Sequence, residues 1–348
     1  MADVRAQGVG KEWLALQAAG ALRPRECVDA LRAGVRPRDL LARLAERVPS
    51  DRWLCRGERQ LAQLGAVLLP WGTPGYPPQL RELADAPPVL AVRGDPATLA
   101  QPAVAIVGSR AASAYGLEVA RRVAGELASA GLVVVSGLAF GIDAAAHEAA
   151  IAAGGRTVAV QACGIDRVYP AAHRALAERI AHSGAVVTEL ALGVAPLPAF
   201  FPLRNRLISG LARALVVVEA RERSGSLVTA RHAADQGVEV FAVPGPITSP
   251  HHVGTNRLLR DGAAPLLETE DVLAALAWPS APRRTRAQLA LSDAALGLLD
   301  ALRGEPASGD DLARRLETAP AALAPPLLEL ELAGAIARDR DGRWRALL

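Results

Sequence analysis

The sequence predicts an α/β fold centred on a doubly wound parallel sheet with helices on both faces, and three observations support this. Short β-branched apolar runs alternate with amphipathic stretches in residues 69–275. Most of these runs are continuously apolar, which indicates strands buried on both faces and therefore a parallel sheet. Half of the 348 residues are hydrophobic (51%), enough for a large core and for two or three domains.

Residues 1–68 are predicted to form a small helical domain of the SAM or helix-hairpin-helix kind. Apolar residues recur at helical intervals between Trp13 and Val48, and Gly and Pro residues divide them into short helices. Such a bundle can bind the DNA backbone, or it can serve as a cap or partner surface. We favour the cap or partner surface, because the pattern is not diagnostic of DNA binding.

Residues 69–275 are predicted to form an extended Rossmann-like domain. Its lead-in, residues 70–88, is rich in Pro and Gly, and its prolines favour an extended chain. Amphipathic stretches such as 115–130 and 173–182 are expected to be helices between the strands. The expected strands are 104–107, 132–135, 157–160, 185–187, 215–218 and 238–243.

A linker is expected at residues 276–289, followed by a winged-helix-like domain at 290–348. Ser292 and Ser308 are candidate helix N-caps, and Asp311 lies three residues after Ser308, as in a capping box. Asp341-Gly342 lies between two short extended runs and predicts a tight hairpin turn. Three helices and such a hairpin are typical of a winged helix.

Charge and composition narrow the class of protein. The net charge is only +3, which by itself is weak support for a nucleic-acid partner. Lys11 is the only lysine, so any phosphate site must use arginine, although a GC-rich genome would also produce this bias. The stretch MADVRAQGVGKEW lacks the apolar core expected of a signal peptide, and no uncharged apolar run approaches the roughly 20 residues that span a bilayer. We therefore expect a soluble, cytoplasmic protein with no membrane contact.

Ligands of doubly wound sheets bind at the carboxyl ends of the strands, and polar residues follow several of the predicted strands. Gly108-Ser109-Arg110 follows the first strand and combines a tight turn with phosphate donors. The second strand is followed by Phe140-Gly141, where the backbone can approach a ligand closely. Asp143 is expected to cap the next helix, and His147 is expected to pack or to form local hydrogen bonds.

The segment Phe200-Phe201-Pro202-Leu203-Arg204-Asn205-Arg206 is the most informative one. It combines an aromatic face for a base with guanidinium groups for phosphates, as single-stranded nucleic-acid sites do. Alternatively, the phenylalanines anchor a loop in the core, and we expect at least one of them to do so.

Ser224-Gly225-Ser226 follows the strand at 215–218 and opens a helix, which makes it a candidate anion cradle. Glu219, just ahead of it, could be a catalytic carboxylate. It has no paired histidine or second acid at an informative spacing, so we expect it to orient an arginine.

Several motifs are absent from the sequence. There is no GxxxxGK[ST] and no GxGxxG after the first strand, so neither NTP hydrolysis nor a dinucleotide cofactor is expected. His251-His252 has no third ligand at a sensible spacing, and Cys27, Cys55 and Cys163 form no CxxC pair. No Ser-His-Asp constellation can be assembled. We therefore expect no cofactor, no metal, no disulfide framework and no enzymatic activity.

Taken in order, these motifs resemble the DNA-processing protein A family (DprA, also called Smf). Each motif alone is weak, but six in order are specific. The six motifs are Gly108-Ser109-Arg110, residues 136–143, Phe201 to Arg206, Ser224 to Ala230, Ala242-Val243-Pro244-Gly245 and Gly254-Thr255-Asn256. Tyr76-Pro77 and Pro87-Pro88-Val89-Leu90 also match the family's lead-in.

The resemblance implies a homodimer that binds single-stranded DNA, protects incoming DNA in natural transformation and loads the RecA recombinase onto it. A phosphate pocket and a base contact by Phe201 are implied as well. The implied DNA-binding residues are Gly108, Ser109, Arg110, Phe140, Gly141, Phe201, Arg204, Asn205, Arg206, Ser224, Gly225 and Ser226.

Two features depart from the family's pattern. The basic residue that precedes the phenylalanine in many members is absent from Leu197-Pro198-Ala199-Phe200, so one phosphate contact is missing or is supplied by another arginine. In the C-terminal domain, Pro325-Pro326 is expected to interrupt the recognition helix, and no basic residue lies between Arg315 and Arg338. We expect little DNA affinity there except at the basic wing of Arg338, Arg340, Arg343 and Arg345.

Two other functions remain open. One is a nucleotide-processing enzyme of the phosphoribohydrolase type, although the PGGxGT segment of that group is missing here. The other is a protein-interaction scaffold with a vestigial pocket. The scaffold gains support if Arg110 and Arg206 turn inward to structural carboxylates.

Overall fold

The computed structural model describes residues 10–20, 23–44, 47–279, 291–302, 305–339 and 341–346. The chain divides into two compact units, Met1–Pro279 and Ser280–Leu348, and each is described by itself. From residue 280 onward, the linker predicted at 276–289 lies outside the described residues.

The first unit is built on one sheet, in the order β1-β2-β6-β5-β4-β3-β7-β8-β9. The pairs from β6 to β9 are parallel, whereas β2 is antiparallel to both β1 and β6. The predicted α/β class is confirmed, and all six predicted strands are present. The bounds are β1 Ala66–Pro70, β2 Val89–Gly94, β3 Ala103–Val107, β4 Val133–Ser136, β5 Thr157–Val160, β6 Ala185–Thr188, β7 Ala214–Val217, β8 Glu239–Ala242 and β9 Ala264–Pro265.

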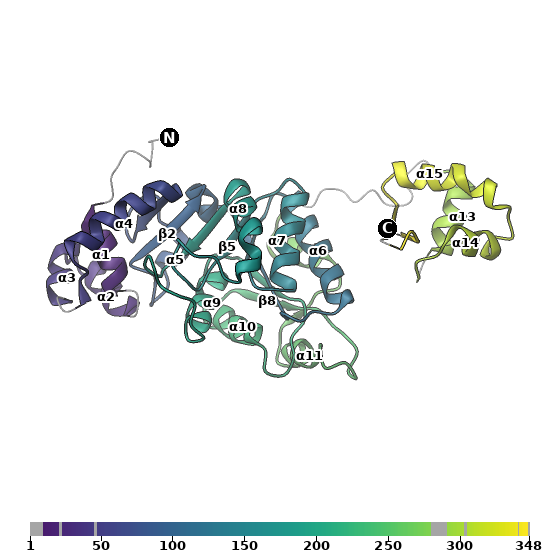
Figure 1. Cartoon of the computed structure of the whole chain (residues 1–348). Coiled ribbons are helices and arrows are strands. Elements are labelled where there is room, and N and C mark those ends of the chain that lie inside the picture. The colour runs from purple at the N-terminus through teal and green to yellow at the C-terminus, as the bar shows by residue number, and fades with distance from the viewer. Residues whose placement is uncertain are drawn as a thin grey trace. The chain divides into compact units, whose positions relative to one another are not determined.

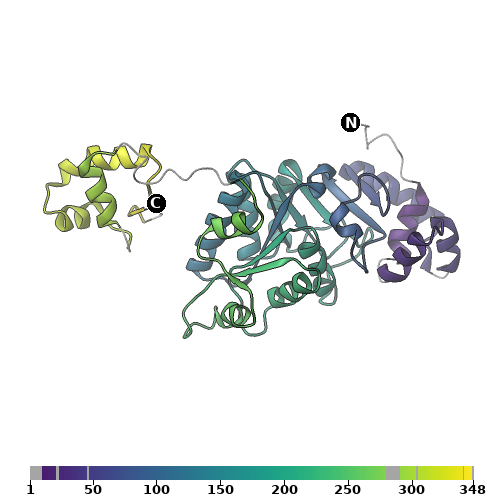
Figure 2. The same ribbon diagram turned by 180° about the vertical axis from the view of Figure 1, so that it is seen from behind.

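Helices cover both faces of this sheet (Figures 1 and 2). On β3, Val104 and Ile106 join the core beneath α6 and α7, whereas Ala105 and Val107 join the core beneath α9 and α10. Both faces are therefore packed, which explains why β3 and its neighbour β7 are apolar at every position. The bounds are α5 Pro78–Arg81, α6 Ala114–Ser129, α7 Ile142–Ala152, α8 Arg174–Ser183, α9 Phe200–Gly210, α10 Gly225–Asp235, α11 Val253–Arg260 and α12 Thr269–Ala275.

The winding of the chain reverses at β3. Strands β4, β5 and β6 follow on one side of β3, and β7 and β8 then lie on its other side. The loops that leave β3 and β7 consequently diverge, and doubly wound sheets leave a ligand crevice at such a switch point.

The lead-in at residues 70–88 is more compact than the extended chain that its prolines predicted. It connects β1 to β2, which pair antiparallel, and it contains the short helix α5. Tyr76 is buried, and its hydroxyl donates to the Pro87 carbonyl at 2.8 Å. The Tyr-Pro and Pro-Pro motifs therefore close a hairpin at the edge of the sheet.

Helices precede the sheet in the described part of the region before β1, as predicted. They are α1 Lys11–Gly20, α2 Pro24–Arg32, α3 Pro37–Arg43 and α4 Asp51–Leu64. Leu14 of α1 and Leu54 of α4 share a core with Leu68 of β1 and Leu176 of α8. These helices thus cover the β1–β2 end of the sheet (Figure 1).

The second unit contains α13 Asp293–Ala301, α14 Gly309–Arg315, α15 Ala324–Leu332 and the antiparallel hairpin β10 Ile336–Arg338 and β11 Trp344–Ala346. The predicted caps are confirmed: Ser292 caps α13, and Ser308 forms a capping box with Asp311. The predicted hairpin is also confirmed, although Arg340 lies outside the described residues.

The expected break at Pro325-Pro326 is wrong. Both prolines lie in the first turn of α15, where a backbone N–H has no partner within the helix. They begin the helix instead of interrupting it.

In the part of the chain that the structure describes, no helix has the length and apolarity needed to cross a bilayer.

Candidate nucleic-acid interface

A cavity of about 460 Å³ lies at the switch point, between the loops that follow β3, β4 and β7 and the first turns of α9 and α10. Most of the predicted site residues line it, although they come from distant parts of the sequence. The lining includes Gly108, Ser109, Arg110, Phe201, Arg204, Asn205, Ser224, Gly225 and Ser226, but not Phe140, Gly141 or Arg206.

The loop after β3 supplies an exposed cation. Ser109 is buried, and its Oγ accepts a hydrogen bond from the Ala111 N–H at 3.2 Å, which fixes the turn. The exposed Arg110 guanidinium lies 5.0 Å from the centre of the Phe201 ring and has no carboxylate partner among the described residues. An arginine held over a ring in this way keeps its N–H groups available for a phosphate.

A second arginine forms part of the cavity floor. Arg204 is only 5% exposed and donates to the carbonyls of Gly137, at 2.7 Å, and Val160. Burial lowers the pKa of Arg204 to about 10, although the nearby Asp143 carboxylate acts in the opposite direction. A Cβ atom at Gly137 would lie 2.7 Å from the guanidinium carbon, so this close contact requires glycine.

Asp143 and His147 both support the fold near this floor. The predicted cap by Asp143 is wrong, because its carboxylate reaches back to the N–H groups of Gly137 at 3.1 Å and Ala139 at 3.3 Å. Burial raises the pKa of Asp143. The local role predicted for His147 is confirmed by a hydrogen bond of 2.6 Å between its Nδ1 and the Thr157 hydroxyl.

Arg206 departs from the expected DNA contact. It is 3% exposed and forms ion pairs with Glu189, at 2.5 Å, and Asp85, at 3.1 Å. Burial raises the pKa of Glu189, and Arg206 opposes that shift. An arginine held in this way supports the fold, and nothing in the spacing of Arg204 and Arg206 distinguishes their roles.

The start of α10 forms one wall of the cavity. Ser224 is the N-cap of this helix, and its Oγ lies 2.7 Å from the Ser226 hydroxyl. Asn205 Nδ2 donates to the Gly225 carbonyl at 3.2 Å and so ties α9 to this turn. The first-turn N–H groups and the positive end of the helix make this wall suitable for an anion.

Two further arginines, which the predicted set of site residues omits, also line the cavity. Arg221 and Arg223 lie in the loop between β7 and α10, and both are exposed. Neither has a carboxylate partner within the described ranges of the chain. They follow a predicted strand directly, so the rule that identified Ser224-Gly225-Ser226 could have identified them as well.

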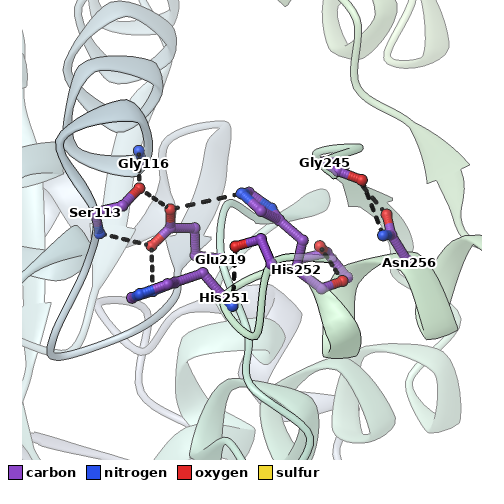
Figure 3. Close-up of polar contacts among 9 residues, drawn as sticks. Ser113, Gly116, Glu219, Gly245, His251, His252 and Asn256 are labelled. Atoms are coloured by element: carbon purple, nitrogen blue, oxygen red, sulfur yellow. Dashed lines mark hydrogen bonds and ion pairs between the residues drawn. The ribbon is translucent and has the colours of Figure 1, made fainter. Parts of the chain in front are cut away.

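Glu219 connects the loop after β3, which carries Ser113, to the segment ahead of α11, which carries His251 and His252 (Figure 3). Its buried carboxylate accepts from the Ser113 N–H at 3.0 Å and from the Ser113 hydroxyl. His251 Nδ1 lies 3.5 Å and His252 Nε2 lies 3.8 Å from its oxygens. The expectation that Glu219 orients an arginine is therefore wrong, because its partners are a serine and two histidines that lie far away in the sequence.

Gly116 and Asn256 complete this support (Figure 3). A Cβ atom at Gly116 would lie 2.3 Å from the Glu219 carboxyl carbon, so glycine makes room for the carboxylate. The Asn256 side chain accepts from the Gly245 N–H at 3.3 Å and donates to the Gly245 carbonyl at 3.0 Å. The loop after β8 is thereby fixed to α11.

Phe140 and Gly141 lie beside the cavity. Gly141 has a φ of 75°, and a Cβ atom there would lie 2.3 Å from the Ser109 carbonyl oxygen. Glycine thus lets the loop after β4 pack on the loop that carries Arg110. Phe140 is 47% exposed and packs edge-on against His173.

Taken together, the cavity offers guanidinium groups, helix N–H groups and hydroxyls on its walls and one aromatic ring at its mouth. The fully buried groups, Glu219, His147 and Asp143, already have structural partners. This arrangement suits binding of a phosphate and a stacked ring.

Comparison with known proteins gives two family matches. The model of the family described as DNA recombination-mediator protein A matches residues 67–277. The model described as DprA winged helix domain matches residues 282–342.

Individual proteins agree with these matches. Protein Smf of Escherichia coli (strain K12) is 42% identical over 294 residues, which cover 82% of this chain and 79% of that protein. DNA processing protein DprA of Streptococcus pneumoniae (strain ATCC BAA-255 / R6) is 44% identical over 199 residues, 57% of this chain and 70% of that protein.

Two solved structures are similar as well. The X-ray structure of DprA from Streptococcus pneumoniae matches with a TM-score of 0.63 and 36% identity, over 77% of this chain and 93% of that one. The second is a structure that concerns the single-stranded DNA binding mode of DNA processing protein A from Helicobacter pylori. It matches with a TM-score of 0.56 and 29% identity. That match covers 62% of this chain and 97% of the other.

Proposed function

Because the chain belongs to the DNA recombination-mediator protein A family, we propose that it binds single-stranded DNA in the cavity at the switch point of its sheet. The observation that carries this proposal is the position of Arg110. Its guanidinium is exposed at the cavity, lies over the Phe201 ring and has no carboxylate partner in the described part of the chain.

The phosphate is held, in this proposal, between the loop after β3 and the start of α10. Arg110 supplies a two-pronged donor, and Ser224, Gly225 and Ser226 supply N–H and hydroxyl groups opposite to it. Gly108 keeps the backbone close, since a Cβ atom there would lie 2.6 Å from the Ile142 side chain. Glu219 and Gly141 position the loops without touching the ligand.

Phe201 takes a base on its exposed side. Arg221 and Arg223 supply the phosphate contact that the uncharged stretch Leu197-Pro198-Ala199-Phe200 leaves out. We exclude Arg206 from the site because its guanidinium is buried between two carboxylates.

The scaffold alternative gains support if both Arg110 and Arg206 turn toward structural carboxylates. Arg206 meets that condition, and Arg110 does not. The enzyme alternative draws no support from the buried acids, which are engaged with backbone and serine groups. A binding protein that is not an enzyme is therefore the function we propose.

Family membership also supports a place in recombination. We propose that the protein acts in the cytoplasm as a homodimer, protects incoming single strands in natural transformation and loads the RecA recombinase onto them. Mass measurement in solution tests the dimer. RecA filament assembly on strands coated with single-strand-binding protein tests the loading, which is expected to be faster when the protein is present and unchanged if the proposal is wrong.

Strand preference tests the binding itself. Fluorescence anisotropy is measured with a labelled oligo-dT and with a duplex of the same length at several salt concentrations. We expect tight binding of the single strand, weak binding of the duplex and a steep loss of affinity with salt. Equal affinity for both, or weak binding of both, contradicts the proposal.

A further inference from the structure

Four aromatic side chains form two pairs, one of which includes the cavity-lining Phe201. The rings of Phe201 and Tyr169 lie 5.6 Å apart, and those of Phe140 and His173 lie 4.6 Å apart, both edge-to-face. Tyr169 and His173 belong to one short segment between β5 and α8, so the two pairs are neighbours. We name Phe201, Tyr169, His173 and Phe140 the aromatic strip.

The strip is open to solvent, although rings of this size are usually buried. Tyr169 is 44% exposed and Phe140 is 47% exposed. The whole chain has four Phe and three Tyr residues. Three of these seven, Phe201, Tyr169 and Phe140, belong to the aromatic strip. An exposed concentration of rings in a chain this poor in them indicates a binding surface.

His173 holds the far end of the strip in place. Its Nδ1 lies 2.9 Å from the Leu138 carbonyl, which can only accept, so this nitrogen carries a proton. Leu138 has a φ of 60°, an unusual conformation for a branched residue, in the turn that presents Phe140. His173 thus fixes the turn through its hydrogen bond to Leu138, and it fixes the Phe140 ring by packing against it.

The charges around the strip favour a polyanion. Arg167 and Arg174 flank Tyr169 and His173 in the sequence, and both are exposed. Of the nearby acids, Asp166 is engaged by the Gly193 N–H at 2.9 Å and by the Gln60 amide at 3.4 Å, and Glu178 forms an ion pair with Arg93. Rings interleaved with exposed arginines are the equipment of a sequence-tolerant surface for single strands.

We propose that the aromatic strip is a second base-binding surface, along which single-stranded DNA continues from the cavity toward Phe140. This inference rests on the proposed function, because it places the nucleotides next to the one whose phosphate the cavity holds. Bases stack on Tyr169 and on the Phe140–His173 pair, and Arg167 and Arg174 contact the phosphates between them. The strand therefore leaves the cavity on the β5 side of the sheet and not on the β8 side.

Abasic DNA separates base stacking from backbone contacts. Anisotropy is measured with oligo-dT and with an oligomer of the same length built from abasic sites, for the full chain, Tyr169→Ala and Phe140→Ala. Each variant is expected to lose about five- to fiftyfold in affinity for oligo-dT. Neither is expected to lose affinity for the abasic strand. Leu267→Ala is the control, since this leucine is 76% exposed and does not line the cavity.

The outcomes distinguish the strip from the cavity. An equal loss on both strands, or no loss on oligo-dT, overturns the strip while leaving the cavity proposal intact. Failure of the unaltered protein to bind oligo-dT overturns the cavity proposal as well.

Photochemical crosslinking tests the same contact without any substitution. Oligo-dT that carries 5-iodouracil is irradiated with the unaltered protein, and the modified residues are identified by mass spectrometry. Crosslinks at Tyr169, His173 or Phe140 are expected. Crosslinks confined to Phe201, or found on the β8 side of the sheet, contradict the proposed path.

Discussion

The arginines of this protein differ in burial, and burial decides what each one does. Arg204 and Arg206 lie two residues apart on α9, yet the first lines the cavity and the second is enclosed by Glu189 and Asp85. A motif read from sequence treats them alike. Only the helix geometry, which points side chains two positions apart in different directions, separates them.

Glu219 shows how a single buried group can hold a binding surface together. Replacing it by alanine leaves the Ser113 N–H and hydroxyl without their acceptor and frees the loop that carries Arg110. We expect Glu219→Ala to lower the free energy of unfolding by about 1–3 kcal/mol and to weaken oligo-dT binding. Urea unfolding and anisotropy measure the two effects.

Glu222→Ala is the control for that substitution, because Glu222 lies on the same loop but is exposed. Its unfolding free energy is expected to stay close to that of the unaltered protein. If both variants have the stability of the unaltered protein, Glu219 does not support the loops.

His147 makes the fold sensitive to acid. The Thr157 hydroxyl donates to the Val134 carbonyl, so it accepts from His147 Nδ1–H. The buried Nε2 then has no partner among the described residues. Burial lowers the pKa of His147 from 6.5 to about 3, because a proton on Nε2 would place a charge in the core.

The direction of the pH effect follows from linkage. Above pH 6.5 the histidine is neutral in both folded and unfolded chains, and its contribution to stability is fully present. Between pH 6.5 and about 3 only the unfolded chain gains the proton, so the free energy of unfolding decreases as the pH is lowered. Unfolding measured across this range should show a shallower fall for His147→Gln, whereas the exposed His182→Gln should behave like the unaltered protein.

Among the helices and strands, the sequence predicted the repeated elements better than the edges. The six core strands were recognisable because burial on both faces makes most of their positions apolar. The hairpin β1–β2 and the short β9 were not recognised, since prolines dominate the first connection and β9 has only two residues. Proline also misled the prediction for α15, where it begins the helix.

The candidate site was predictable in part for a related reason. Residues that follow a strand are adjacent in the sequence to a strong signal, so Gly108-Ser109-Arg110 and Ser224-Gly225-Ser226 were found. Glu219 is separated in the sequence from His251 and His252 by α10 and β8. Their contact could therefore not be predicted from a local sequence motif. Arg221 and Arg223 needed only the same rule applied to the residues just before Ser224.

The hairpin of the second unit gives a prediction of its own. The helix ahead of the hairpin, α15, has no basic residue. Arg338, in contrast, ends β10, and Arg343 directly precedes β11. We expect Arg338→Glu together with Arg343→Glu to change oligo-dT affinity by less than about twofold, since the cavity provides most of the binding. A tenfold or greater loss, measured by anisotropy on the full chain, would place this unit in the DNA site.

For the molecule as a whole, the binding surface is a consequence of topology. The loops after β3 and β7 diverge because β7 is placed on the opposite side of β3 from β4. The helices α9 and α10 then present their first turns at the same opening. A net charge of +3 gives no hint of this site, because it sums over the whole chain, whereas Arg110, Arg221 and Arg223 meet at the cavity only through the fold.

The salt dependence of oligo-dT binding by Arg110→Ala tests this account most directly, with the exposed Arg121→Ala as control. If Arg110 holds a phosphate, affinity should fall at least about tenfold, and the slope of log K against log salt should become shallower by about 0.7. Arg121→Ala should match the unaltered protein. An Arg110→Ala variant with unchanged affinity and slope would contradict the phosphate pocket, and with it the function proposed for this protein.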